Sequence, residues 1–127
     1  MNELLLIEDD ETDVLFFERA LAEAGGGVLL QVAEDAEEAV SRLRRPGPPP
    51  ALVVLDLVLR RGSGLEILEW LRREPALKDV PVVVLTSSRN PAELARAREL
   101  GVQRVEIKPA GFAELRALVG AILEGIW

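Results

Sequence analysis

The stretch Leu52–Val53–Val54–Leu55–Asp56 decides the fold, because an uninterrupted apolar run ends there at a single carboxylate. Short Val/Leu runs of this kind are typical of strands that are buried on both faces of a parallel sheet. Two further runs end in the same way: Leu4–Ile7 meets Glu8–Asp9–Asp10, and Val82–Leu85 meets Thr86–Ser87–Ser88. The carboxyl ends of parallel strands lie at one edge of a sheet, where open α/β folds bind ligands. We therefore expect these polar residues to form one site.

Amphipathic helical patterns alternate with the apolar runs, which favours an α/β fold. The expected strands are Leu4–Ile7, Val28–Val32, Leu52–Leu55, Val82–Leu85 and Arg104–Ile107. The expected helices are Thr12–Ala24, capped by Asp10 or Thr12, then Ala36–Arg44, Leu65–Arg73, Ala92–Leu100 and Phe112–Ile126. With right-handed crossovers, the simplest arrangement is a doubly wound five-stranded parallel sheet in the flavodoxin-like order 2-1-3-4-5. No second domain is indicated, so residues 1–127 are expected to form a single domain.

Composition narrows the classes of function. The net charge of −7 argues against nucleic acid or anionic lipid as a main partner. The chain contains neither Cys nor His, which excludes disulfides, a thiolate nucleophile and imidazole catalysis. The N-terminus lacks a signal peptide pattern, and no apolar stretch has the length of a transmembrane helix. These features predict a soluble, cytoplasmic protein.

Glu8, Asp9 and Asp56 are expected at neighbouring strand ends, and gathering them there is costly. Two unit charges about 4 Å apart repel by about 4 kcal/mol at an effective dielectric constant of about 20. Such a group therefore requires a cation or a raised pKa, and Mg²⁺ suits carboxylates of this kind. Taken singly, each residue has a simpler interpretation. The acidic triplet could be a solvated helix cap, Asp56 a loop cap, Thr86 a strand residue and Lys108 a surface lysine.

Together, these residues resemble the receiver domains of two-component response regulators along nearly the whole chain. The matching features are Ile7–Glu8–Asp9, the run that ends at Asp56 with Gly64 after it, Thr86 after the fourth strand, and Lys108–Pro109. The family has the flavodoxin-like fold inferred above from the alternation of runs and helices.

The resemblance implies a function and a role for each residue. Asp56 would be the phosphoacceptor and would take a phosphoryl group from a phosphohistidine of a sensor histidine kinase. Asp9 would hold Mg²⁺ directly, Glu8 would hold it through water or lie near it, and the backbone carbonyl of Val58 would complete the protein ligands. Thr86 would move to hydrogen-bond the phosphoryl group, and Lys108 would pair with its charge.

Two positions depart from the family pattern. Arg60 stands where a Pro commonly follows the phosphoacceptor, and Val105 stands where an aromatic switch residue usually precedes the lysine. A closer resemblance is to stand-alone regulators associated with bacterial phytochromes. It rests on Leu85–Thr86–Ser87–Ser88, the Pro46–Pro50 connection and the terminal Ile126–Trp127.

Three other functions compete with this interpretation. An aspartyl-nucleophile phosphohydrolase often has a second Asp two residues after the nucleophile, where this chain has Val58. A nucleotide- or flavin-binding module is unsupported, because no G-x-G-x-x-G follows the first strand. A degenerate receiver that serves only for interaction would be expected to lose Asp56 or Lys108, and both are present.

The output of the protein is expected to depend on another molecule, because the sequence ends one helix after Lys108 without an attached effector. The apolar stripe of Phe112–Ile126 and the terminal Trp127 are compatible with a homodimer through the C-terminal helix, and the resemblance to phytochrome-associated regulators, which are often dimeric, favours it. Folding of Trp127 onto its own domain is the alternative.

Overall fold

The computed structural model describes residues 2–25 and 27–126, which form five strands and five helices in alternation. The strands are β1 (Asn2–Ile7), β2 (Val28–Ala33), β3 (Leu52–Leu55), β4 (Val82–Thr86) and β5 (Arg104–Ile107). The helices are α1 (Glu11–Ala24), α2 (Ala36–Leu43), α3 (Gly64–Arg73), α4 (Pro91–Glu99) and α5 (Phe112–Ile126).

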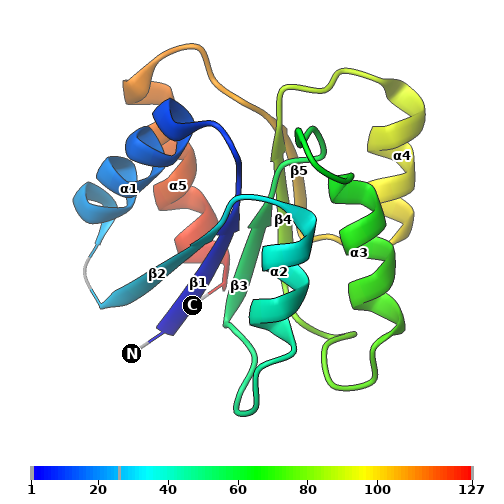
Figure 1. Ribbon diagram of the computed structural model, residues 1–127. Coiled ribbons are helices and arrows are strands. Elements are labelled where there is room, and N and C mark those ends of the chain that lie inside the picture. Colours follow the sequence, from blue (N-terminus) through cyan, green and yellow to red (C-terminus); the bar gives the residue numbers. More distant parts are fainter. Residues whose placement is uncertain (1, 26, 127) are drawn as a thin grey trace.

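All neighbouring strands are parallel, and their order is β2-β1-β3-β4-β5. This confirms the predicted flavodoxin-like α/β sheet. The register places Ile7 beside Leu55 and Leu55 beside Val84, so β1, β3 and β4 end at the same edge. Helices α1 and α5 cover one face of the sheet, and α2, α3 and α4 cover the other (Figure 1).

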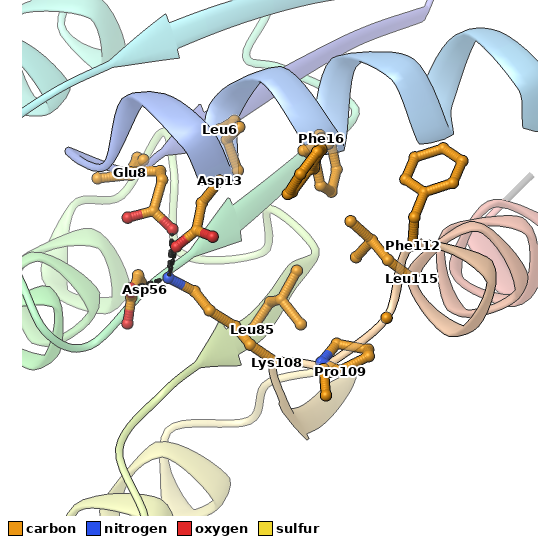
Figure 2. A pocket seen from close by; sticks show the side chains of 14 residues that line it. Leu6, Glu8, Asp13, Phe16, Asp56, Leu85, Lys108, Pro109, Phe112 and Leu115 are labelled. Atoms are coloured by element: carbon orange, nitrogen blue, oxygen red, sulfur yellow. Dashed lines mark hydrogen bonds and ion pairs between the residues drawn. The ribbon is translucent and has the colours of Figure 1, made fainter.

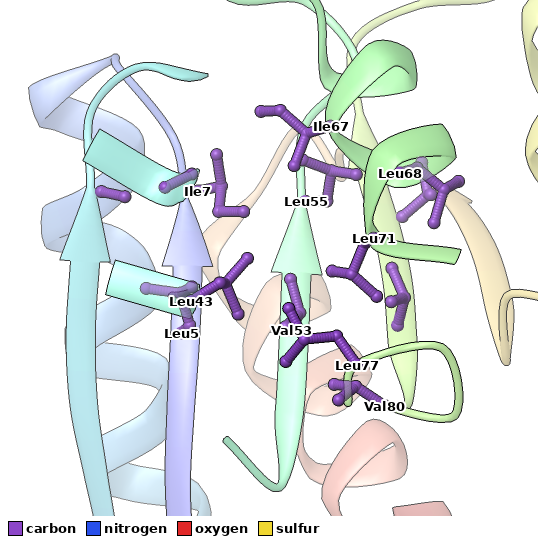
Figure 3. Close-up of a cluster of buried hydrophobic side chains, with 14 of the residues drawn as sticks. Leu5, Ile7, Leu43, Val53, Leu55, Ile67, Leu68, Leu71, Leu77 and Val80 are labelled. Atoms are coloured by element: carbon purple, nitrogen blue, oxygen red, sulfur yellow. The ribbon is translucent and has the colours of Figure 1, made fainter. Parts of the chain in front are cut away.

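Alternate residues of the central strands point into two separate cores. Leu5, Ile7, Val53 and Leu55 pack against α2 and α3 with Ile67, Leu68 and Leu71 (Figure 3). Their neighbours Leu4, Leu6, Leu52 and Val54 pack against α1 and α5. Because the side chains of a strand alternate between its faces, a continuous apolar run satisfies both cores at once.

Helix α1 begins one residue earlier than predicted, because Asp10 is its N-cap. The Asp10 side chain accepts a hydrogen bond from the Asp13 amide at 3.0 Å, which satisfies one of the free N–H groups of the first turn. The predicted alternative cap, Thr12, lies inside the helix. None of the described helices combines the length and the apolar character needed to cross a membrane.

Gly64 allows α3 to begin directly against the end of β3. A Cβ atom at this position would lie 2.1 Å from the Asp56 carbonyl oxygen and 2.7 Å from the Leu57 Cα. The Gly64 amide also donates to the Leu57 carbonyl at 3.2 Å. Any larger residue would therefore push apart the loop that carries Asp56.

Candidate functional site

Backbone hydrogen bonds continue past the strand ends and fix the residues of the site. The Asp56 amide donates to the Ile7 carbonyl at 3.1 Å, and the Lys108 amide donates to the Thr86 carbonyl at 2.9 Å. On the other side of β1, the Glu8 amide donates to the Ala33 carbonyl at 3.0 Å. The side chains that follow the apolar runs are thus held at one edge of the sheet, as the sequence predicts.

The Asp56 carboxylate lies in the centre of this edge, and the residue is only 3% exposed. Its Oδ1 accepts hydrogen bonds from the Thr86 hydroxyl at 2.6 Å and from the Val58 amide at 3.0 Å. Its Oδ2 lies 2.7 Å from Lys108 Nζ. Thr86 itself is fully buried as the last residue of β4, one position beyond the predicted end of that strand.

The Lys108 ammonium lies among three carboxylates (Figure 2). Lys108 Nζ is 2.6 Å from Glu8 Oε1, 2.7 Å from Asp56 Oδ2 and 2.7 Å from Asp13 Oδ2. One cation therefore connects the ends of β1, β3 and β5 with the first turn of α1. The cluster of Glu8, Asp13, Asp56 and Lys108 has a formal charge of −2 when all the groups are ionised.

The electrostatics of Glu8 reflect this excess of negative charge. Burial raises the pKa of Glu8 to about 7, and the hydrogen bond from Lys108 opposes that shift. The Asp56 charge raises the pKa of Glu8 further. For Lys108, burial alone would lower the pKa, but the hydrogen bonds to Asp13, Asp56 and Glu8 outweigh it and raise the pKa. Lys108 is thus held charged.

Asp9 points toward the loop after β3 instead of toward Lys108. Its Oδ2 accepts a hydrogen bond from the Arg60 amide. A Pro, which commonly stands at the Arg60 position in the resembling family, has no amide proton to give. Because this chain has Arg60 at that position, it can form a hydrogen bond to Asp9 that a Pro could not form.

The structure brings together four of the residues that the sequence predicts for the site: Glu8, Asp56, Thr86 and Lys108. It places Asp9 and Val58 nearby in the same region, Asp9 on the Arg60 amide and Val58 beside Asp56. Within residues 2–25 and 27–126, no group of three or more His, Cys, Asp or Glu side chains is arranged so that it could hold a metal ion as it stands. The reason is visible in the contacts, since Lys108 Nζ lies between Glu8 and Asp56.

Val105 and Asp13 are the two remaining points of comparison with the sequence analysis. Val105 is partly buried against the core that faces α2, α3 and α4. The sequence analysis missed Asp13, whose carboxylate contacts Lys108 Nζ, because it treated the first turn of α1 only as a cap. The signal that could have found it is an acidic residue about one helical turn after Asp9, because that turn faces the edge where Lys108 was expected.

An apolar cavity of about 180 Å³ borders the site on the side of α1 and α5. It lies between the Lys108 side chain and two aromatic residues, Phe16 and Phe112 (Figure 2). The centroids of the two rings are 6.2 Å apart. Phe16, on α1, is exposed. The cavity thus leaves unfilled space beside the side chains of Lys108 and Asp13.

Comparison with known proteins agrees with this geometry. The sequence profile of the family described as response regulator receiver domain matches residues 4–120. The response regulator Rcp1 of Synechocystis sp. is 32% identical over 129 residues, which cover 98% of this chain and 87% of Rcp1. The phosphate regulon transcriptional regulatory protein PhoB of Escherichia coli is 32% identical over 126 residues. That match covers 99% of this chain and 54% of PhoB, so the chain spans about half the length of PhoB.

Solved structures give the same result. The phosphorylated cyanobacterial phytochrome response regulator RcpA is 31% identical, with a TM-score of 0.90, and the match covers 98% of this chain and 93% of RcpA. The Mn²⁺-bound form of Rcp1 is 31% identical, with a TM-score of 0.87 and coverage of 96% of this chain and 91% of Rcp1. The structural neighbours thus include phytochrome response regulators, as the closer resemblance predicted. This chain belongs to the family of response regulator receiver domains.

Proposed function

We propose that this protein accepts a phosphoryl group on Asp56 from a phosphohistidine of a sensor histidine kinase. The observation that carries the proposal is the environment of the Asp56 carboxylate. It is buried, it is at the carboxyl edge of the sheet, and it contacts a hydroxyl donor and an ammonium at 2.6 and 2.7 Å. Both donors are placed where they could pair with the oxygens of a phosphoryl group on Asp56.

The reaction transfers the phosphoryl group from nitrogen to oxygen. A carboxylate oxygen of Asp56 forms the new bond to phosphorus while the P–N bond breaks, and its electron pair returns to the imidazole of the kinase. Charge develops on the three equatorial oxygens, so donors at the site accelerate the step. Lys108 pairs with that charge, and Thr86 exchanges its bond to Asp56 for one to the phosphoryl group.

The reaction is proposed to depend on Mg²⁺, and the donor set fits this ion. The residues that would hold it are Glu8, Asp9, Asp56 and the backbone carbonyl of Val58, all of which offer the oxygen ligands that Mg²⁺ prefers. The cluster around Lys108 supports the fit, because one ammonium does not offset the formal charge of three carboxylates. When bound, the ion supplies neutralisation of the phosphoryl oxygens. The solved Mn²⁺-bound form of the relative Rcp1 is consistent with a divalent ion at such a site.

The kinase is proposed to be a bacteriophytochrome, and the reaction to take place in the cytoplasm. Support comes from the phytochrome response regulator RcpA among the structural relatives. The protein is proposed to transmit the signal through a partner or through self-association, and to act neither as an enzyme that turns over a substrate nor on nucleic acid. The phosphohydrolase alternative gains no support, because Val58 stands where the second Asp would be expected.

Self-association is proposed to involve the C-terminal helix α5. Val119, Ile122 and Leu123 of α5 are buried against its own sheet, so this stripe is already covered. Trp127, the other residue on which the dimer prediction rests, lies outside the described residues. Sedimentation of the intact chain and of one lacking Ile126–Trp127 tests it. A monomer in both, with and without phosphorylation, would end this part of the proposal.

The main test is phosphoryl incorporation from a small phosphodonor with Mg²⁺, measured as the intact mass of the protein. Wild type and the control Asp35→Asn, which changes the N-cap carboxylate of α2 to an amide, should both gain one phosphoryl group. Asp56→Asn should gain none. Full incorporation into Asp56→Asn would refute the assignment.

A further inference from the structure

Asp13 stands apart from the other carboxylates around Lys108. Glu8 and Asp56 follow directly after strands, and their side chains are each 4% exposed. Asp13 belongs to α1, and its side chain is 39% exposed. Its Oδ2 nevertheless lies 2.7 Å from Lys108 Nζ, as close as Asp56 does.

The fold holds Asp13 in place independently of Lys108. The Asp13 amide is fixed by the Asp10 cap at 3.0 Å, and a carboxylate in the first turn is favoured by the partial positive charge of the helix N-terminus. Its position therefore does not depend on the ion pair. The ion pair instead joins α1 to the segment after β5.

A lysine ammonium has three N–H donors, and here three carboxylates take them. A phosphoryl group on Asp56 would bring new oxyanions to Lys108, and these would compete with its present carboxylate partners. The bond to Asp13 is the most exposed of the three, so solvent screens it most and its loss costs least. The adjoining cavity of about 180 Å³ gives these side chains room to rearrange without repacking the core.

We propose that Asp13 is a positioning residue that competes with the phosphoryl group for Lys108. It holds the third donor of Lys108 before phosphorylation and releases it afterwards. Asp13 thereby limits how readily the site accepts an anionic donor, because the donor must displace it from Lys108. The inference rests on the proposed function, because it takes Asp56 as the acceptor.

The first experiment measures the rate of phosphoryl incorporation at several concentrations of a small anionic phosphodonor with Mg²⁺. Asp13→Asn keeps the size of the side chain but removes its charge, and it should lower the donor concentration that gives half the maximal rate by about threefold. Asp13→Glu restores a carboxylate and should return this concentration to the wild-type value.

Glu11→Gln is the matched control. Glu11 is an exposed acidic residue in the same turn of α1, and it is absent from the contacts of Lys108. A general field effect would act on both variants alike, whereas competition for Lys108 acts through Asp13 alone. The inference is overturned if Asp13→Asn matches wild type or is slower, or if Glu11→Gln gains as much.

A second measurement does not depend on phosphorylation. The chain has only two lysines, Lys78 and Lys108, so ¹⁵N-lysine labelling gives two ammonium signals with Lys78 as an internal reference. Asp13→Asn should shift the Lys108 signal and speed its proton exchange, and Glu11→Gln should change neither. An unchanged Lys108 signal in Asp13→Asn overturns the inference. If wild type is not phosphorylated at all, the proposed function fails, and this measurement still decides whether Asp13 holds Lys108.

Discussion

Lys108 and Arg72 are both partly buried cations, but they are held by opposite kinds of partner. Lys108 contacts three carboxylates at 2.6–2.7 Å. Arg72 donates only to backbone carbonyls: Leu100 at 2.7 Å, Val80 at 2.8 Å, Lys78 at 3.0 Å and Gly101 at 3.3 Å. Burial lowers the pKa of Arg72, partly opposed by the Asp79 charge, whereas the pKa of Lys108 is raised.

This difference in partners indicates that the contacts of Lys108 can change with ionisation, metal binding or phosphorylation, whereas those of Arg72 cannot. Carboxylates can gain a proton, bind a metal or be phosphorylated, so the partners of Lys108 are exchangeable. Backbone carbonyls neither take up a proton in this pH range nor accept a phosphoryl group, and none of these four is among the proposed Mg²⁺ ligands, so Arg72 fixes the end of α4 and the loop after α3 to one another. We therefore expect Lys108 to respond to pH and Mg²⁺, and Arg72 to respond to neither.

The largest expected effect is that of Arg72→Met. It leaves four carbonyls without their donor and should lower the free energy of unfolding by about 3 kcal/mol. The loss, measured by urea denaturation, should be the same at pH 6 and pH 8 and with or without Mg²⁺. Arg73→Met, an exposed neighbour on the same helix, serves as the control and should change little. A loss that Mg²⁺ repairs would remove the distinction between the two cations.

Lys108→Met comes next, because it leaves Glu8, Asp13 and Asp56 without their shared cation. At pH 8 without Mg²⁺ the free energy of unfolding should fall by about 2 kcal/mol. Most of this loss should disappear at pH 6, where Glu8 can take a proton, or when Mg²⁺ is added. Lys78→Met is the control. An equal loss under all these conditions would place Lys108 in the same class as Arg72.

Mg²⁺ itself should stabilise the wild type by mass action. At a concentration about 50 times its Kd, the gain in the free energy of unfolding should be about 2 kcal/mol. Asp9→Ala should lose most of this gain, although the apo protein can become more stable once a repelling charge is gone. The control Glu37→Ala, on the exposed side of α2, should keep it. A full Mg²⁺ response in Asp9→Ala would contradict the proposed metal site.

A smaller effect is expected from Thr86→Ala. The variant loses the 2.6 Å hydrogen bond to Asp56 and should lower the free energy of unfolding by about 1 kcal/mol. Phosphorylation of Asp56 should continue, but hydrogen exchange in α4 should no longer change when beryllium fluoride and Mg²⁺ are added. Ser87→Ala, an exposed neighbour, should keep the wild-type change. The same change in α4 in Thr86→Ala would contradict the role of Thr86.

Glu8 is expected to give the stability a pH dependence of its own. Its pKa is about 7 in the folded apo protein and 4.5 ordinarily, so the unfolded state binds fewer protons between these values. The stability that protonated Glu8 gives is complete below pH 4.5 and is lost as the pH rises through about 7. Urea midpoints of the apo wild type should therefore fall over this range more than those of Glu8→Gln. Equal slopes would show that Glu8 does not titrate there.

The sequence predicts the parts of the fold that depend on local patterns. Strand β3 begins and ends where the sequence analysis placed it, because its apolar run has clear limits, and β5 also has the predicted limits although its sequence alternates charged and apolar residues. Differences at other boundaries are one or two residues, as at Asp10, where two capping residues competed. The predicted Asp56, Thr86 and Lys108 meet because all follow strands of one polarity.

Contacts between distant segments were beyond the sequence analysis. Asp13 reaches Lys108 across 95 positions, and Arg72 reaches Leu100 across 28. Neither residue interrupts a periodic pattern. The position of Asp13 in a first helical turn and that of Arg72 in a last helical turn are each explained by the helix dipole, so nothing in the sequence points to a distant partner. The Asp9–Arg60 contact was hidden for a related reason, since it uses a backbone amide that carries no sequence signal.

The most direct test of the account is to locate the phosphoryl group on the chain. Asp56 shares its edge with Glu8, Asp9 and Asp13, so intact mass alone does not say which carboxylate reacts. The acyl phosphate can be reduced with borohydride after incubation with a small phosphodonor and Mg²⁺, and the product mapped by peptide mass spectrometry. The account predicts that all of the label lies on Asp56. Label on Glu8, Asp9 or Asp13 in wild type would contradict it.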